Sequence, residues 1–542
     1  MNYFSTRQGF LISSYSLKES ELEKIDKFLY FIDKSGVLKL VVSDNFEASK
    51  GGRPVYNQAN LFAAILYCFT FGKGTLRSIE EMCQYDLRVI YIMDGETPTH
   101  MTISNFINEK MKPRIKEIYA AITMAIVREC DIDTSTIFID GSKFEADANK
   151  YKFVWKPVKY HEKLSDKIRI LLEKYHLNDS TTQEGIIAIK TVAAKLSTLS
   201  EAVTDRHPDF KLMTDYLSKS IEYEEKERIC GPDRNSYYKT DRDATAMCLK
   251  EDYYSGLGSN MHAAYNSQLG VSDGIIIWCM ISQSRSDFKD FIPFLEEYAR
   301  YYGVYPQNAV ADAGYGSQAN YQFLADKGIT SYVKHSSWEG NVSGRNPFRY
   351  RLNNDETITC LNGITGKKAE AKGWHHKKKG TVFYEIEGCT NCPFVAYCKK
   401  HSRSKEEDSK LFEVNEELRF HIQQSEENLL SVKGIEMRVN RSAQVEGAFG
   451  VIKQDFGYER FRRTGLSNVV LEFMLVCLGY NIRKLFKHFS GSLHKKYWKA
   501  PKGIKPESFK KPSAKRLSNR ANKESSKSVN QQAKDSYKYH RQ

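Results

Sequence analysis

The first 130 residues carry apolar side chains at helical spacing. Leu22, Ile25 and Phe28 share one helical face behind a capping-box pattern formed by Ser16 and Glu19. The same spacing returns several times up to a long helix expected from Ile103 to about Cys130, with Thr102 as its cap. Short helices connected by tight turns are compatible with a helix-turn-helix DNA-binding domain, and equally with a helical bundle that does not bind DNA.

The pattern changes to strands at two places that each end in an aspartate. Residues 136–140 are a β-branched and aromatic run that finishes at Asp140, and residues 308–312 finish in the same way at Asp312. Between them the pattern predicts two strands joined at a Ser272-Asp273-Gly274 turn and then a helix. These strands and this helix are expected at 263–272, 274–281 and 287–301.

Two stretches interrupt this alternation of strands and helices. Residues 160–240 are a charged helical stretch, and residues 336–410 are polar and irregular and hold four of the eleven cysteines. We expect the following division: a helical N-terminal DNA-binding domain at 1–130, the first part of a core at 131–335 with an insertion at about 160–240, a cysteine-containing polar insertion at 336–410, the last part of the core at 411–490, and a basic flexible tail at 491–542.

Asp140, Asp312 and a glutamate on a late helix, Glu446, suggest a metal-dependent reaction. Two carboxylates at the ends of neighbouring strands can meet a third from a helix packed across the sheet. Three convergent carboxylates repel one another unless a cation lies between them, and Mg²⁺ prefers such oxygen ligands. Two ions about 4 Å apart would suit phosphodiester cleavage. A single aspartate at the end of a strand, by contrast, is usually only a turn or cap residue.

The overall charge favours a polyanionic partner. The chain has 81 Lys and Arg against 67 Asp and Glu, a formal net charge of +14, and the 42 residues from Pro501 onward hold 12 Lys and Arg against 3 acids. Neither a signal-peptide pattern nor an apolar run of about 18 residues is present, so we expect a cytoplasmic protein with no membrane partner. No glycine-rich phosphate loop appears either, which argues against a nucleotide cofactor.

Three ordered segments resemble the DDE transposases of bacterial insertion sequences, in the IS-four-like superfamily and its eleven-eighty-two branch. Residues 140–156 resemble the block around the first aspartate, residues 310–317 the block around the second, and residues 445–463 the block around the glutamate. Shorter matches lie outside these blocks, at Gly52-Arg-Pro54, His100–Phe106 and Tyr265-Asn-Ser-Gln268.

The resemblance implies a fold, a reaction and partners. The fold class is α+β or α/β, with an RNase H-like core preceded by the helical domain and interrupted by the two insertions. Asp140, Asp312 and Glu446 would be the catalytic residues and would bind Mg²⁺ or Mn²⁺, as two ions. The substrate would be double-stranded DNA, both transposon ends and target, and the enzyme a homodimer near the bacterial nucleoid.

One part of the family signature departs from the expected pattern. The superfamily carries Tyr-x2-Arg-x3-Glu-x6-Lys around its glutamate, and Lys453 stands in place seven residues after Glu446. The arginine position is Ser442, so Arg441 or Arg438 would have to substitute. Further candidates for DNA contact follow from charge alone, although a solvated basic face explains them equally well. The full set of expected DNA contacts is Lys453, Arg441, Arg460, Arg463 and Lys143.

Four cysteines form a separate candidate metal site. Cys360, Cys389, Cys392 and Cys398 have the number and type of ligands that a structural zinc takes, in a stretch with few apolar residues to form a core. The alternatives are free thiols, or replacement of one ligand by a nearby histidine. Those histidines are His375, His376 and His401.

We therefore expect a transposase that cleaves DNA strands and transfers them to a target. Two alternatives stay open: an RNase H-like nuclease without strand transfer, and a domesticated regulator that binds DNA without catalysis. Inverted repeats bracketing the reading frame would separate a transposase from a regulator.

Overall fold

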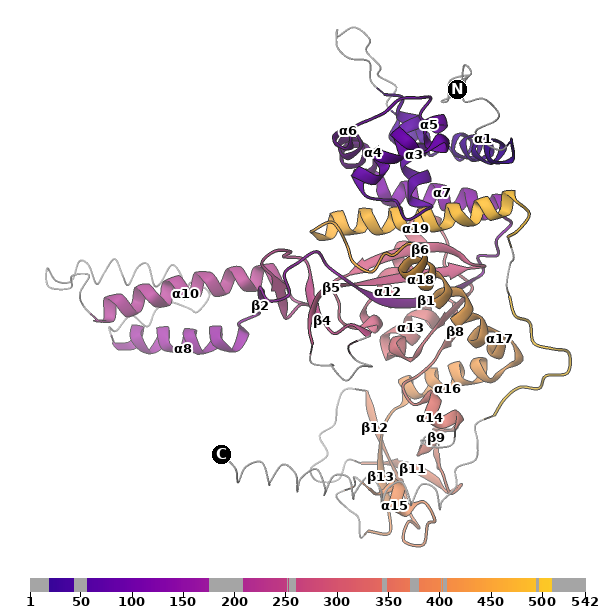
Figure 1. Cartoon of the computed structure of the whole chain (residues 1–542). Coiled ribbons are helices and arrows are strands. Elements are labelled where there is room, and N and C mark those ends of the chain that lie inside the picture. The colour runs from indigo at the N-terminus through magenta and orange to yellow at the C-terminus, as the bar shows by residue number, and fades with distance from the viewer. Residues whose placement is uncertain are drawn as a thin grey trace, which may run out of the picture.

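A mixed sheet lies at the centre of the molecule, with helices beyond one edge of the layer and a second, smaller sheet at the opposite end (Figure 1). This computed structural model describes residues 19–42, 56–174, 208–250, 252, 260–343, 349–370, 380–400, 402, 407–493 and 497–508.

The central sheet has the order β4-β5-β1-β7-β8, and β6 also pairs with β5. Strand β1 is antiparallel to β5 and parallel to β7, and β7 is parallel to β8. The strands are β1 (Thr136–Glu145), β4 (Thr245–Met247), β5 (His262–Ser272), β6 (Ile275–Ser282), β7 (Asn308–Ala311) and β8 (Thr330–Val333). The expected strands and the mixed α/β class are thus confirmed.

Two details of these strands bear on the sequence predictions. The expected turn between β5 and β6 is present, because Asp273 and Gly274 both adopt positive φ, at 49° and 76°. The expectation that the first strand ends at Asp140 is wrong. Strand β1 continues to Glu145, pairing with β5 throughout, because Phe144 is fully buried and holds the extension against the core.

The N-terminal helices share one hydrophobic core with the sheet. Helix α19 (Leu466–Phe489) contacts β6 as well as α7 (Ile115–Glu129) and α3 (Gln58–Phe69). Trp278 of β6 is fully buried, with the ring of Tyr119 from α7 edge-on to it and the ring of Tyr301 from α12 (Phe291–Tyr302) stacked on it. Apolar side chains from Ile25 to Leu485 belong to this single cluster.

The long helical stretch expected from Ile103 to about Cys130 is present, but the predicted Thr102 cap and an uninterrupted α-helix are wrong. Thr99 caps α6 (His100–Phe106), and α7 starts only after a π-helical and a 3-10 segment. Pro113 lies in the 3-10 segment, where its missing N–H interrupts the α-helical hydrogen bonds. The remaining elements of this region are α1 (Glu19–Lys34), α2 (Leu38–Val41), α4 (Leu76–Tyr85), α5 (Leu87–Ile92), η1 (Ile107–Met111) and η2 (Lys112–Arg114). Ser16 and Gly52-Arg-Pro54 lie outside the described residues.

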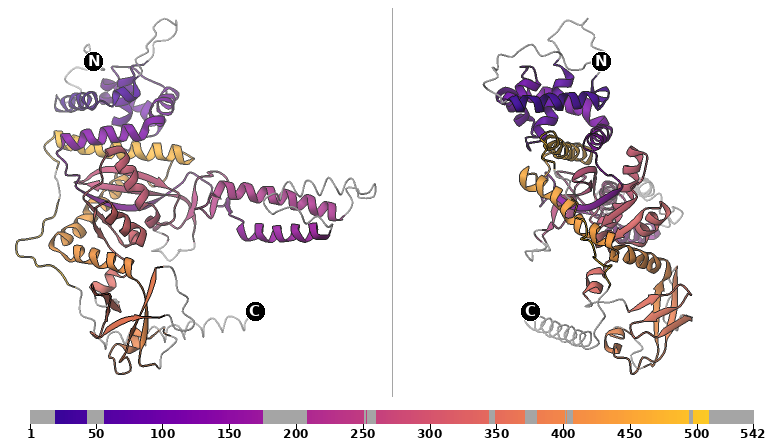
Figure 2. Two further views of the ribbon diagram at one scale, coloured as in Figure 1. Left: turned by 180° about the vertical axis from the view of Figure 1, so that it is seen from behind. Right: turned by 90° about the vertical axis from the view of Figure 1, so that its right-hand side faces the viewer.

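A helical arm projects from the sheet, where the charged helical insertion is expected (Figures 1 and 2). Two paired strands form its base, and α8 and α10 pack along each other beyond them. The elements are β2 (Phe153–Trp155), α8 (Val158–Lys174), α10 (Pro208–Cys230) and β3 (Ser236–Tyr238). Residues 175–207 lie outside the description.

Residues 336–410 are expected to be irregular, and this prediction is wrong. They contribute most of a second, antiparallel sheet with the order β13-β12-β11-β10-β9. Its strands are too short to show a clear alternation, and its core has only five buried apolar residues. The strands are β9 (Tyr350–Leu352), β10 (Ile358–Cys360), β11 (Thr365–Ala369), β12 (Thr381–Ile386) and β13 (Lys410–Asn415). Next to it lie α14 (Trp338–Val342), α15 (Val395–Cys398) and α16 (Glu416–Leu430).

The sequence predicts a flexible tail from residue 491 onward. The structure contradicts this for the described residues 497–508, which contact the rest of the chain. The Tyr497 ring packs beside that of Phe138, the Trp498 N–H donates to Asn440 Oδ1 (2.8 Å), and the Glu507 carboxylate pairs with Arg438 (2.6 Å). The Tyr497 ring, the Trp498 backbone and the Glu507 carboxylate therefore hold this segment against the rest of the chain. Across the described segments, no helix combines the length and the apolar character that crossing a membrane requires.

Candidate active site

Asp140 and Asp312 stand side by side on two parallel strands. In the register of β1 and β7, Phe138 faces Val310, and each aspartate lies two residues further along its own strand. Because side chains alternate along a strand, both aspartates leave the sheet at the same level and on the same face. Asp140 lies within β1, and Asp312 follows β7 directly as the cap of η5 (Ala313–Tyr315).

Glu446 reaches the same place from a broken helix. This helix consists of α17 (Val432–Arg441), η6 (Ser442–Glu446), α18 (Gly447–Gly450) and η7 (Val451–Asp455), and η6 contacts both β1 and β5. Arg441 Nη1 lies 3.0 Å from Asp140 Oδ2, and Arg441 Nη2 lies 3.2 Å from Glu446 Oε1. One guanidinium therefore joins the two carboxylates, while Ser442 Oγ donates to Glu446 Oε2 at 2.6 Å.

A π-helical turn explains why the arginine is one position early in the sequence signature. Arg441 precedes Glu446 by five residues, and η6 is π-helical, so residues five apart share a face. Arg438, the other candidate, pairs with Glu507 and lies over the Trp338 ring. Of the two arginines, the structure brings only Arg441 to the carboxylates.

Burial and charge set the electrostatics of the cluster. The Asp140 side chain is 19% exposed, that of Arg441 16% and that of Glu446 51%. Burial raises the pKa of Asp140 to about 6; the Arg441 charge opposes this rise and the Asp312 carboxylate adds to it. Asp312 itself accepts a hydrogen bond from the Gly314 N–H at 2.8 Å.

A fourth carboxylate, Asp287, lies beside the three predicted ones, and sequence reasoning missed it. Its Oδ1 accepts from Asn266 Nδ2 (2.8 Å) and Gln268 Nε2 (2.9 Å), which project from β5. A Cβ placed on Gly141 would lie 2.6 Å from Asp287 Oδ1, so any side chain at the residue after Asp140 would displace this carboxylate. The available signal was the Tyr265-Asn-Ser-Gln268 block, whose amides are the groups that hold this carboxylate.

Buried polar groups fix this fourth carboxylate in turn. The Tyr315 hydroxyl donates to Gln268 Oε1, and Tyr315 is fully buried. Asp290, three residues after Asp287, accepts from Asn266 Nδ2 (3.0 Å) and Ser282 Oγ (2.6 Å), and burial raises its pKa to about 7. Asn266 therefore connects both aspartates to strand β5.

The other expected DNA contacts have partners within the protein. Lys453 Nζ lies 4.8 Å from the centre of the Phe144 ring, which places it near the strand of Asp140. The other three residues contact polar groups of the protein. Lys143 donates to the Cys248 carbonyl (3.3 Å), Arg460 forms an ion pair with Asp147 (3.1 Å), and Arg463 donates to Asn108 Oδ1 (3.2 Å).

No metal-binding group is formed by the side chains as they stand. Within the described ranges, no three His, Cys, Asp or Glu side chains are arranged to hold an ion. At the carboxylates, the Arg441 guanidinium lies between Asp140 and Glu446. At the second sheet, Cys360, Cys389, Cys392 and Cys398 line one small cavity. His375, His376 and His401 lie outside the described residues.

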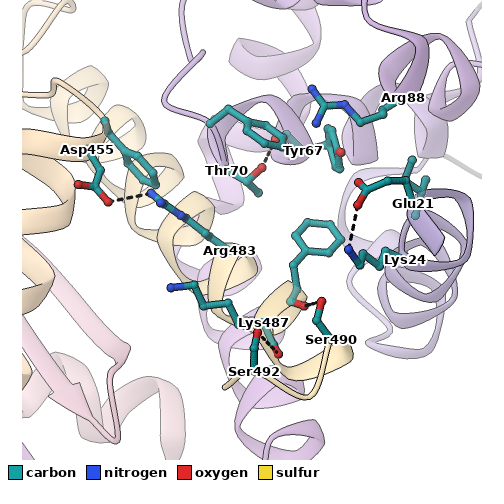
Figure 3. Close-up of a pocket in the computed structure, with 14 residues that line it drawn as sticks. Glu21, Lys24, Tyr67, Thr70, Arg88, Asp455, Arg483, Lys487, Ser490 and Ser492 are labelled. Atoms are coloured by element: carbon teal, nitrogen blue, oxygen red, sulfur yellow. Dashed lines mark hydrogen bonds and ion pairs between the residues drawn. The ribbon is translucent and has the colours of Figure 1, made fainter. Parts of the chain in front are cut away.

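A larger pocket of about 460 Å³ lies elsewhere, between α1, α3 and α19 (Figure 3). Two of its cations are paired with acids: Lys24 with Glu21 (2.8 Å) and Arg483 with Asp455 (3.2 Å). None of the predicted catalytic carboxylates lines it. We therefore place the candidate site at the carboxylate cluster.

Comparison with known families yields two matches. Residues 359–486 match the family model described as a transposase DDE domain, and residues 13–109 match that described as a transposase domain. The first match covers Glu446 and Arg441 as well as all four cysteines. No curated protein and no solved structure matches the chain.

Proposed function

We propose that this chain, which belongs to the DDE transposases of insertion sequences, cleaves DNA strands and transfers them at Asp140, Asp312 and Glu446. The observation that carries the proposal is the convergence of these residues from two adjacent parallel strands and one helix. Asp140 and Glu446 meet at a single cation, and Asp312 lies beside Asp140 in register. The family implies a DNA substrate, and a homodimer stays a prediction.

The strand order supports an RNase H-like core. Three antiparallel strands, β6, β5 and β1, are followed across the sheet by two strands parallel to β1. The first aspartate lies on the central strand β1 and the second follows its parallel neighbour. Glu446 comes from a later helix that packs against β1, which is the arrangement that the sequence resemblance implies.

The donor set fits a divalent cation. Asp140 Oδ2 and Glu446 Oε1 already hold one positively charged group between them, and carboxylate oxygens are the ligands that Mg²⁺ and Mn²⁺ prefer. The residues that would hold two such ions are Asp140, Asp312 and Glu446. When bound, the ions would activate the attacking oxygen and stabilise the leaving one.

Residues around the carboxylates have separable tasks. Arg441 neutralises Asp140 and Glu446 in the structure, and when it is released its guanidinium can bind a DNA phosphate through two hydrogen bonds. Gln268 and Asn266 orient Asp287 toward the cluster without entering it themselves. Lys453, on the same helical segment as Glu446, would place a second positive charge on the DNA backbone.

The function is tested with the DNA that flanks the reading frame. Purified chain is incubated with Mg²⁺ and a plasmid carrying both flanks, and the products are sequenced. We expect cleavage at inverted repeats and joining of the freed 3′ ends to target DNA. Cleavage without joined products would instead support the nuclease, and binding without cleavage the regulator.

Arg441→Gln should increase the affinity for Mn²⁺ in the absence of DNA by about tenfold, because it removes the positive charge that competes for Asp140 and Glu446. The same change should lower cleavage, since glutamine cannot pair with a phosphate as the guanidinium does. Mn²⁺ binding is followed by electron paramagnetic resonance, with Arg438→Gln as the matched control on the same helix. Equal affinities in all three proteins would show that Arg441 does not compete with the metal.

Removal of residues 509–542 should weaken binding to end-containing and random DNA alike. These residues hold ten Lys and Arg, and such a segment neutralises phosphates without reading bases. The slope of log affinity against log salt should fall by about 0.9 for each phosphate that the shortened chain no longer neutralises. A selective loss of end preference would instead assign sequence recognition to this segment.

The helical region before Asp140 is the expected site of end recognition. Deleting all of it is a poor test, because its helices share the core of the sheet. The exposed basic residues Arg77 of α4 and Lys73 in the loop before it offer a cleaner test. Charge-removing substitutions there should reduce end preference while circular dichroism stays unchanged.

A further inference from the structure

We propose that Cys360, Cys389, Cys392 and Cys398 bind one structural zinc ion at the second sheet. The four thiols line a single cavity of about 20 Å³, which is room for one water-sized particle. Thiolate sulfur is a preferred zinc ligand, and a structural site takes four ligands. This inference concerns the stability of the second sheet and does not depend on the proposed catalytic chemistry.

Tight loops present the cysteines from three segments of chain. Cys360 ends β10 at a hairpin that Gly363 closes by donating its N–H to the Cys360 carbonyl (3.0 Å), with a φ of 80° at the glycine. Cys392 follows Cys389 in a turn in which the Cys392 N–H donates to the Cys389 carbonyl (3.2 Å). Cys398 closes the short helix α15. An ion bound here would join the hairpin to the 389–398 loop.

One backbone group already points at a ligand sulfur. The Phe394 N–H donates to Cys392 Sγ at 3.4 Å. Hydrogen bonds of this kind stabilise the thiolate form that zinc requires, because the donor dipole faces the negative charge.

Two buried lysines beside the cavity supply the matching charge. Lys399 is 5% exposed and Lys410 is 7% exposed, and Lys399 also lines the cavity. Their ammonium groups contact backbone carbonyls, Lys399 that of Glu407 and Lys410 that of Cys398. Burying a cation is costly unless an anion accompanies it. Four thiolates around one Zn²⁺ carry a net charge of −2, which would balance both lysines.

The second sheet needs such a support. Its core consists of only five fully buried apolar side chains, with Cys360 and Cys398 packed against them. A core of this size supplies too little hydrophobic free energy to hold five short strands, and small modules commonly add a metal. No three thiols of the described segments converge at ligand distance, so binding must close the two loops on each other.

The consequence for the rest of the chain is a fixed connection toward Glu446. Strand β13 leads directly into α16, whose first turn is capped by Asn415, and α16 packs on β8 of the central sheet. Zinc would therefore stabilise the sheet from which the chain leads, through α16, into the broken helix of Glu446.

The test uses the full chain purified without chelator. Elemental analysis should find about one zinc per chain, and cobalt substitution should give the absorption of a tetrahedral thiolate site. Cys389→Ser combined with Cys392→Ser should lose both, whereas Cys248→Ser, a cysteine outside the cluster, should keep them. Circular dichroism shows whether the double variant retains the fold of the rest of the chain.

Two outcomes would overturn the proposal. One is a zinc content in the wild-type protein no higher than in the double cysteine variant. The other is reaction of all four thiols with a thiol reagent at the same rate before and after the bound zinc is removed with a chelator. Because these measurements use neither DNA nor Mg²⁺, and Asp140→Asn should keep its zinc, failure here is distinct from failure of the proposed catalysis.

Discussion

Asp140→Asn, Asp312→Asn and Glu446→Gln should each lower DNA strand cleavage by about 10³-fold or more, which is about 4 kcal/mol of transition-state stabilisation. Each change removes the negative charge that a divalent ion needs while keeping the shape of the side chain. Because Asp140 lies on β1, Asp312 directly follows the neighbouring strand β7, and Glu446 meets Asp140 at Arg441, loss of any one should disable the whole cluster.

The measurement compares cleavage with DNA affinity in the same preparations. Binding to an end-containing duplex should change little, since these acids do not contact phosphates without a metal. Asp326→Asn, on the exposed end of α13 (Gln318–Asp326), is the matched control and should cleave normally. A variant of the three that cleaves at the wild-type rate would exclude its residue from the site.

Phe144→Ala should destabilise the protein by about 3–5 kcal/mol, the usual cost of removing a buried phenyl ring. Phe144 is fully buried on β1, four residues after Asp140. Its ring lies within about 6 Å of four other aromatic rings that come from the region of Glu446 and from α19. Those rings belong to Phe449, Tyr458, Phe461 and Phe473.

Urea unfolding followed by circular dichroism measures this loss. Phe153→Ala, at a phenylalanine that is 44% exposed on the arm, should change the unfolding free energy by less than about 1 kcal/mol. A similar small change for Phe144→Ala would mean that this aromatic cluster does not hold the glutamate helix to β1. The loss of unfolding free energy in Phe144→Leu should lie between those of Phe144→Ala and Phe153→Ala, because leucine retains part of the buried apolar volume.

The sequence by itself determined four strands of the central sheet (β1, β5, β6 and β7), the turn between β5 and β6, and the three acidic residues as candidates. These features depend on short-range patterns. Alternating or continuous apolar runs predict strands, Asp273-Gly274 suits a tight turn, and a carboxylate after an apolar run is visible without any tertiary contact. The transposase assignment followed from the same segments and agrees with the family matches.

Long-range packing decided the rest. The position of Arg441 became interpretable only through the π-helical turn, which depends on the contact of η6 with β1 and β5. Asp287 joined the cluster because Asn266 and Gln268, about twenty residues away, donate to it. Strand β1 passes Asp140 because Phe144 enters a core built by residues more than 300 positions later. Sequence periodicity reports which face of an element is apolar, whereas only the folded chain decides which distant side chains meet on that face.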